Sequence, residues 1–108
     1  AQVNSKMEDL KRRAFEIVSK AVVELAEDMG FPSLASPVEA TPLFGGDDGI
    51  DSLSLVRLVA DIERAAEREL GKTIVLADER AMSRRNSPFR TVGTLSELLY
   101  ERAGESHA

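Results

Sequence analysis

The sequence contains no cysteine, and its 108 residues include a single histidine, His107. Without cysteine, disulfide bonds and thiolate metal sites are excluded, and thioester chemistry would need a sulfur attached to the chain after translation. A serine nucleophile needs a base held beside it, and the one histidine stands at the extreme C-terminus of the sequence. We therefore expect that the chain is not an enzyme and holds no metal.

Long apolar runs are also missing. No segment approaches the roughly 20 apolar residues of a membrane span, and no signal-peptide pattern is visible, so we expect a cytoplasmic protein without membrane insertion. The net charge of −5 argues against nucleic acid as a partner and suits basic protein partners. The length predicts one domain over residues 1–108, with its core at about 5–104 and a flexible tail at 105–108.

Apolar residues recur at helical spacing through about residues 5–29. Ser5 and Glu8 fit a capping box at the start of this helix, and Gly30, followed by Pro32, predicts its end. We expect this helix to present one apolar stripe to the core.

A long loop follows at residues 30–50, where proline and glycine are frequent. Loops longer than about 12–15 residues are uncommon in compact domains unless they are functional or disordered. Regularly placed apolar residues favour a functional loop that is pinned to the core. These residues are Phe31, Leu34, Val38, Leu43, Phe44 and Ile50.

The second helix is predicted from Asp51 or Ser52 to Leu70, with Gly71 as its stop. Its first half is apolar nearly all the way round, whereas a helix on a core needs only one apolar stripe. Part of this surface must therefore be covered by the long loop or face a partner.

In the chain after Gly71, we predict one short helix and one longer helix. Thr73–Leu76 reads as an extended segment without a partner strand, and Asp78 caps a short helix at 78–82. The last helix is expected from Thr91 or Thr94 to about Ala103. The pattern predicts an all-α four-helix bundle of three main helices and one short helix.

Ser52 stands where the long loop becomes the second helix. Free amides and the positive end of the helix dipole favour a negative group there, and phosphate is well suited. Asp51 can serve as the N-cap, while Asp47 and Asp48 would repel a phosphate and suggest a docking patch for a basic enzyme or its magnesium ion. Taken alone, Asp-Ser is a common capping pair and needs no ligand.

The wider arrangement resembles the acyl carrier protein family, small four-helix domains that hold a 4′-phosphopantetheine arm. The resembling segments are Gly49-Ile50-Asp51-Ser52-Leu53, the helix over 55–63, Asp78-Glu79-Arg80-Ala81, and Thr91-Val92-Gly93-Thr94-Leu95. The likeness covers about residues 5–104, and the Asp-Ser-Leu helix is its strongest part.

This resemblance implies that a phosphopantetheinyl transferase attaches the arm from coenzyme A to Ser52, between Asp51 and Leu53. The thiol of the arm would hold acyl groups as thioesters for acyl-activating or acyl-transfer enzymes of fatty-acid, lipid or secondary-metabolite synthesis. A monomer is expected. Residues expected to contact partners are Leu53, Val56, Arg57, Asp47 and Asp48. Residues expected to face the core are Leu58, Val59 and Ile62.

Two features depart from familiar carriers, whose second helix is strongly acidic. Here that helix has a mixed face, and the stretch over 72–90 is long and carries four arginines. We expect a specialised, free-standing carrier with dedicated partners. The stretch over 72–90 is either a solvated loop, an edge that binds an acidic partner, or a lid. The mixed face comprises Ser54, Arg57 and Arg64 among Asp61, Glu63 and Glu67, and the four arginines are Arg80, Arg84, Arg85 and Arg90.

Two other functions stay open. A peptidyl, aryl or aminoacyl carrier of non-ribosomal synthesis would use the same serine and arm with a different cargo. A helical adaptor without any arm would explain the apolar second helix by docking it in a partner's groove.

Overall fold

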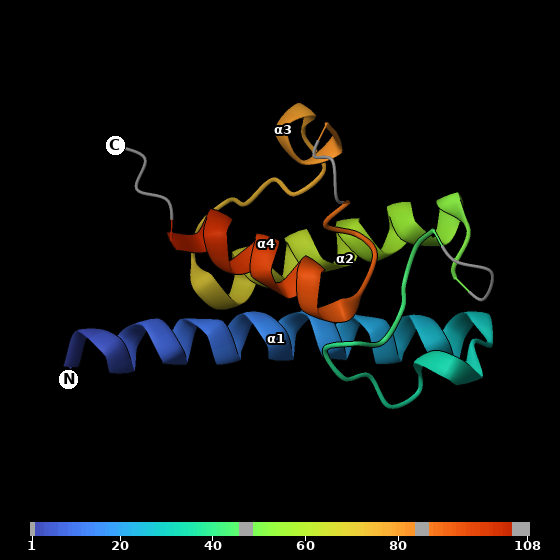
Figure 1. The fold of residues 1–108 in the computed structure, drawn as a ribbon, viewed down its shortest axis with the longest axis horizontal. Coiled ribbons are helices and arrows are strands. Elements are labelled where there is room, and N and C mark those ends of the chain that lie inside the picture. The colour runs from blue at the N-terminus through green and yellow to red at the C-terminus, as the bar shows by residue number, and fades with distance from the viewer. Residues whose placement is uncertain (1, 46–48, 84–86, 105–108) are drawn as a thin grey trace.

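The computed structural model describes residues 2–45, 49–83 and 87–104, and within these ranges the regular structure is helical, without any strand longer than an isolated bridge. Three main helices and one short helix confirm the predicted all-helical bundle (Figure 1). The elements are α1 (Gln2–Met29), the 3-10 turn η1 (Pro32–Leu34), α2 (Ser52–Leu70), α3 (Glu79–Met82) and α4 (Val92–Gly104).

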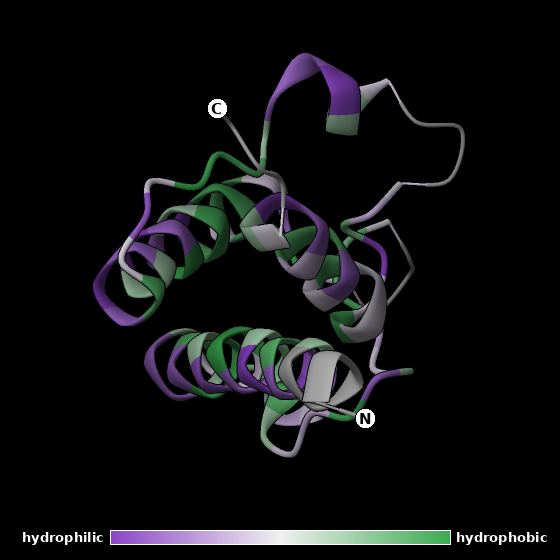
Figure 2. Cartoon of the chain, turned by 90° about the vertical axis from the view of Figure 1, so that its left-hand side faces the viewer, coloured by the Kyte–Doolittle hydropathy of each residue, from purple (hydrophilic) through white to green (hydrophobic). Residues whose placement is uncertain are grey.

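The helices form two layers. Helix α1 runs the length of the molecule, and α2 and α4 pack against it from one side, both running in the opposite direction (Figure 1). Figure 2 shows the two layers end-on, with the short α3 on the side of the second layer that faces away from α1. The start of α2 therefore lies at the same end of the molecule as the last turn of α1.

The core fills the space between the layers. The three residues of α2 that were expected to face it, Leu58, Val59 and Ile62, are all buried. Each fully buried side chain of this size contributes about 1.5–3 kcal/mol to the stability of the fold, so the apolar stripe of α1 and its counterparts on α2 and α4 hold the bundle together. The largest fully buried side chains are Leu25, Leu34, Leu43, Leu58, Ile62, Leu76, Leu95, Leu98, Leu99, Val18, Val22 and Val92.

Most helix boundaries lie where the sequence predicts them. Gly30 and Gly71 end α1 and α2 in the left-handed region, with φ of 77° and 74°, a conformation that glycine adopts without steric cost. The start of α1 was predicted wrongly, because the helix already begins at Gln2 and Ser5 lies inside it. No glycine or proline precedes Ser5, and extending an existing helix costs far less than nucleating one.

Most of the predicted anchors of the long loop are confirmed: Leu34, Leu43 and Ile50 are buried, and the two phenylalanines are partly buried. Val38 was predicted wrongly and is exposed. Its backbone amide donates to the Thr41 hydroxyl at 2.8 Å, and the Thr41 amide donates back to the Val38 carbonyl at 3.0 Å. This turn buries Thr41 and leaves the valine side chain in solvent.

Backbone hydrogen bonds tie the long loop to the start of α4. The Leu43 amide donates to the Arg90 carbonyl at 2.6 Å, and the Gly93 amide donates to the Glu39 carbonyl at 2.8 Å. A Cβ atom at Gly93 would lie 2.9 Å from that same carbonyl oxygen, so only glycine fits this close approach. The Ile50 amide returns to the Leu43 carbonyl at 2.8 Å. The residues that lead into α2 are therefore held by the body of the bundle.

The segment before α3 is extended and unpaired with any described strand, as predicted, and side chains hold it in place. The Leu76 amide donates to the Glu63 carboxylate at 2.8 Å. Arg102 of α4 donates to the Val75 carbonyl at 2.7 Å and to both carboxylate oxygens of Asp78 at 2.7 and 3.1 Å. No local sequence pattern predicts that this arginine is buried.

None of the helices in the described part of the chain is long and apolar enough to cross a bilayer.

Candidate functional site

Ser52 is the first residue of α2, and it is exposed to solvent. The helix begins there because Asp51 is extended, with φ −81° and ψ 174°, and its carboxylate accepts the Ser54 amide at 2.7 Å. The Asp51 carbonyl accepts the first helical hydrogen bond, from the Leu55 amide at 2.9 Å. The predicted cap is thus confirmed as Asp51, and the Ser52 hydroxyl is left on the open first turn.

Ser52 lies between a negative carboxylate, that of Asp51, and the positive end of the α2 helix dipole. The hydrogen bond from the Ser54 amide lowers the pKa of Asp51, so this carboxylate stays ionised and complements the positive end of the helix dipole. A phosphate on Ser52 would be attracted by the same dipole and repelled by Asp51. The Oδ1 atom of Asp51 is engaged as the cap of the helix.

Two exposed apolar side chains lie beside Ser52. Leu53 is 82% exposed and Val56 is 66% exposed, as expected for residues that contact a partner. Side chains of this kind usually lie inside a protein, and here they share the outward surface of the first two turns of α2. They give the surroundings of the serine an apolar surface that another protein could cover.

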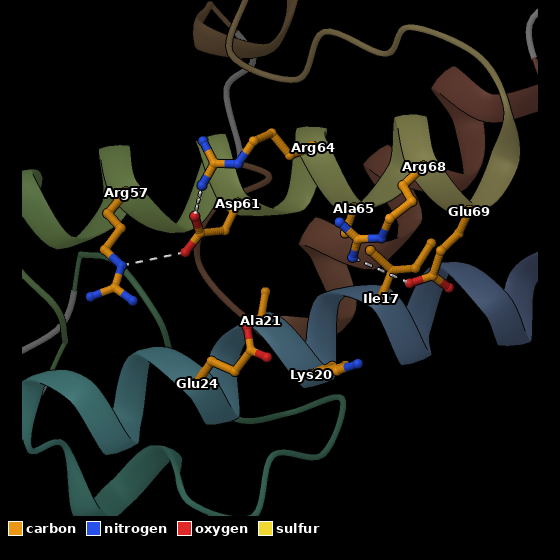
Figure 3. Close-up of a pocket in the computed structure, with 10 residues that line it drawn as sticks. All are labelled: Ile17, Lys20, Ala21, Glu24, Arg57, Asp61, Arg64, Ala65, Arg68 and Glu69. Carbon is orange, nitrogen blue, oxygen red and sulfur yellow. Dashed lines mark hydrogen bonds and ion pairs between the residues drawn. The ribbon is translucent and has the colours of Figure 1, made fainter.

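Arg57 follows this apolar pair along α2 and lies partly exposed. Its guanidinium forms ion pairs with Asp28, at the end of α1, and with Asp61, one turn further along α2. The hydrogen bond to Asp28 is the main reason that the pKa of Arg57 is raised. Arg64 pairs with the other oxygen of Asp61, so Asp61 lies between two arginines at a groove between α1 and α2 (Figure 3).

The mixed face predicted for α2 needs a correction at Ser54. This residue is buried, and its hydroxyl finds no partner among the described residues. Ser54 stands four residues before Leu58, and Ile62 and Ala66 continue the same spacing, so helical geometry places it on the core stripe. That spacing was visible in the sequence and could have identified Ser54 as buried.

Some predicted site residues lie outside the described part of the chain. Asp47 and Asp48, the expected docking patch, are among them, as are Arg84 and Arg85 of the basic stretch. Within the described residues, no group of three or more metal-ligating side chains comes together. The described site therefore consists of Ser52, its cap, and the outward face of α2.

No family model matches this chain, and neither the curated proteins nor the solved structures gave a match.

Proposed function

We propose that this chain is an acyl carrier protein in which Ser52 bears a 4′-phosphopantetheine arm, and that acyl groups travel on it as thioesters between partner enzymes. The observation that carries this proposal is an exposed serine at the first residue of a capped helix, with two exposed apolar side chains beside it. The chain contains no cysteine, and the arm supplies the thiol needed for a thioester.

The attachment reaction asks little of the chain itself. A bond forms between the Ser52 oxygen and the phosphorus that carries the pantetheine in coenzyme A. The bond from this phosphorus to adenosine 3′,5′-bisphosphate breaks, and the hydroxyl proton passes to a base of the transferase. An acceptor serine needs exposure rather than a base of its own, and exposure is what the first turn of α2 provides.

The residues around Ser52 have separate roles in this proposal. Asp51 fixes the start of the helix and so fixes the direction of the serine. Leu53 and Val56 bind the enzyme that works on the arm. The loop anchored at Leu43 and Ile50 holds the whole turn against the bundle, so that the partner meets a preformed surface and loses little free energy in ordering it.

The test is the intact mass of the protein after incubation with coenzyme A, magnesium and a phosphopantetheinyl transferase of broad specificity. We expect a gain of one phosphopantetheine, and fragmentation of the modified peptide should place it on Ser52. A known carrier in the same tube is the positive control. If that control is modified and the folded chain is not, the carrier proposal is wrong, and the adaptor function explains the exposed apolar residues better.

Removing the apolar surface beside Ser52 should slow attachment. We expect the double variant Leu53→Gln, Val56→Gln to lower the kcat/KM of the transferase by about 10- to 100-fold, because each buried aliphatic side chain contributes about 1.5 kcal/mol or more to an interface. Both side chains are exposed, so the free energy of unfolding should change by no more than about 0.5 kcal/mol.

The control for this variant is Met82→Gln, which removes an exposed apolar side chain from α3 instead. It should be modified at the rate of the unchanged protein. Equal rates for the double variant and the control would show that Leu53 and Val56 do not form the contact surface.

A further inference from the structure

Three arginines follow the exposed apolar pair along the outward face of α2. Arg57, Arg64 and Arg68 stand 4, 11 and 15 residues after Leu53, which places them within one side of an α-helix. The side chains of Arg64 and Arg68 are 70% and 68% exposed. We call these three residues the arginine stripe.

Two of the three acidic partners of the arginine stripe, Asp61 and Glu69, are less exposed than the arginines that they face, whereas Asp28 is 56% exposed beside Arg57 at 39%. Asp61, which pairs with Arg57 and Arg64, is only 18% exposed. Arg68 has Glu69 beside it, with 3.9 Å between the nearest nitrogen and oxygen atoms. Figure 3 shows the stripe along the groove between α1 and α2, with Lys20 and Glu24 across it on α1. At Arg64 and Arg68 the arginine is therefore the more exposed member of its ion pair.

This placement runs against the charge of the chain as a whole, which is −5. The groove between α1 and α4 has the opposite character. Glu39, Glu97 and Glu101 line it, and its basic residue, Lys11, lies over the ring of Tyr100 at 5.4 Å. Helix α2 itself carries four acidic and three basic residues, so the exposed positive charge is local to Arg64 and Arg68, on the face that follows Ser52.

We propose that the arginine stripe, together with Leu53 and Val56, is the docking site for an acidic amphipathic helix on the partner enzyme that acts at Ser52. The inference rests on the proposed function, because it names the chemistry of the partner that reaches the serine. An acidic helix with an apolar stripe matches both parts of the surface, since its carboxylates meet the guanidiniums and its apolar residues cover Leu53 and Val56.

The arginines are suited to this role even though they already form ion pairs. A guanidinium has five N–H donors. The hydrogen bonds described above use two nitrogen atoms of Arg57 and one of Arg64. The remaining donors can bind carboxylates in the two-pronged geometry that arginine favours. Opposite charges at the edge of an interface mainly raise the association rate and select the partner, so binding should weaken as salt is added.

The test uses the ¹⁵N-labelled apo protein, so it does not depend on attachment of the arm. Three probes are titrated in turn: a synthetic amphipathic helix of leucine and glutamate, the same helix with lysine in place of glutamate, and inorganic phosphate. We expect the glutamate helix to shift the amide signals of α2 from Leu53 to Arg68, and its affinity to fall as salt is raised.

The variant for this test is Arg64→Glu, Arg68→Glu, which leaves the more central Arg57 in place. It should bind the glutamate helix at least about tenfold more weakly. The matched control is Lys11→Glu, Arg12→Glu, on exposed positions of α1. Each double variant has a net charge of −9, because each of two replacements changes the initial −5 by −2. The control should retain at least half of the original affinity.

Several results would overturn the proposal. It is wrong if the lysine helix binds α2 more tightly than the glutamate helix does, if phosphate alone binds there as tightly, or if the two double variants lose equal affinity. Failure to bind any probe at α2 would also reject it. None of these results touches the mass measurement on Ser52, so a wrong partner chemistry and a wrong carrier function are told apart.

Discussion

Replacing Ser52 by alanine should abolish the gain of phosphopantetheine completely and leave the fold intact. Loss of the hydroxyl removes the only oxygen at this position to which the transferase can attach phosphopantetheine. Ser52 is the first helical residue, and the capping hydrogen bond comes from Asp51, so no cap is lost. Alanine is the better helix former by up to about 0.7 kcal/mol. The measurements are intact mass after incubation and the urea midpoint of unfolding.

The matched control is Ser54→Ala, two residues further along the same turn. The Ser54 hydroxyl is buried without a partner among the described residues, and such a group costs about 1–3 kcal/mol. We expect this variant to be at least as stable as the unchanged protein and to accept one phosphopantetheine. If the Ser52→Ala protein is modified, Ser52 is not the acceptor. If only Ser54→Ala loses modification, the acceptor is Ser54.

The parts of the fold that were predicted correctly depend on local physics. Apolar residues at a spacing of 3.6 identified α1 and α2. Gly30 and Gly71 marked the ends of these helices because a helix often ends with a left-handed residue, a conformation that glycine adopts readily. Asp51 and Asp78 were recognisable as caps because a short acidic side chain can reach an amide three residues on. Each of these signals is contained within a few neighbouring residues.

The parts that were missed depend on contacts between distant segments. Val38 was expected in the core, and a turn closed by the Thr41 hydroxyl turns it outward. Arg102 had no visible role, because its partners Val75 and Asp78 are more than 20 residues away. At the site, the resemblance to acyl carrier proteins led us to expect Leu53 and Val56 to contact partners, and both side chains are exposed.

The arginine stripe is a similar case. The spacing of its arginines was visible in the sequence, but the exposure of their acidic neighbours was not. In the sequence, Asp61 stands between Arg57 and Arg64, so this part of the helix reads as a mixture of positive and negative charges. Only the packing of α2 on α1 shows that Asp61 is mostly covered while Arg64 stays in solvent. Burial, rather than composition, therefore decides which sign a partner meets.

Truncating Arg102 should produce a large loss of stability. Its side chain is only 5% exposed, and it joins α4 to the segment before α3 through the Val75 carbonyl and Asp78. Arg102→Ala would leave that carbonyl without its donor and remove a buried side chain. We expect the free energy of unfolding to fall by about 2–4 kcal/mol. Arg12→Ala, which removes an exposed arginine, should change it by no more than about 0.5 kcal/mol.

The pH dependence of stability distinguishes the contribution of the Asp78–Arg102 ion pair from that of side-chain packing. The Ala81 amide and then Arg102 lower the pKa of Asp78 in the folded protein below its ordinary value of 3.8. A carboxylate whose pKa is lowered by folding stabilises the native state above that ordinary value, and the stabilisation is lost as the pH falls through the lower folded pKa. Asp78→Asn keeps a capping side chain but removes the charge.

We therefore expect the urea midpoint of Asp78→Asn to lie below that of the unchanged protein at pH 7, and the gap between them to close as the pH falls below 3.8. The pKa of Asp51 is lowered too, but both proteins contain it, so its contribution cancels in the difference. In an Arg102→Ala background the Asn substitution should lower the midpoint less, although the hydrogen bond from the Ala81 amide, the larger cause of the lowered pKa, remains. A gap that is the same at every pH, or undiminished without Arg102, would mean that the ion pair does not stabilise this segment.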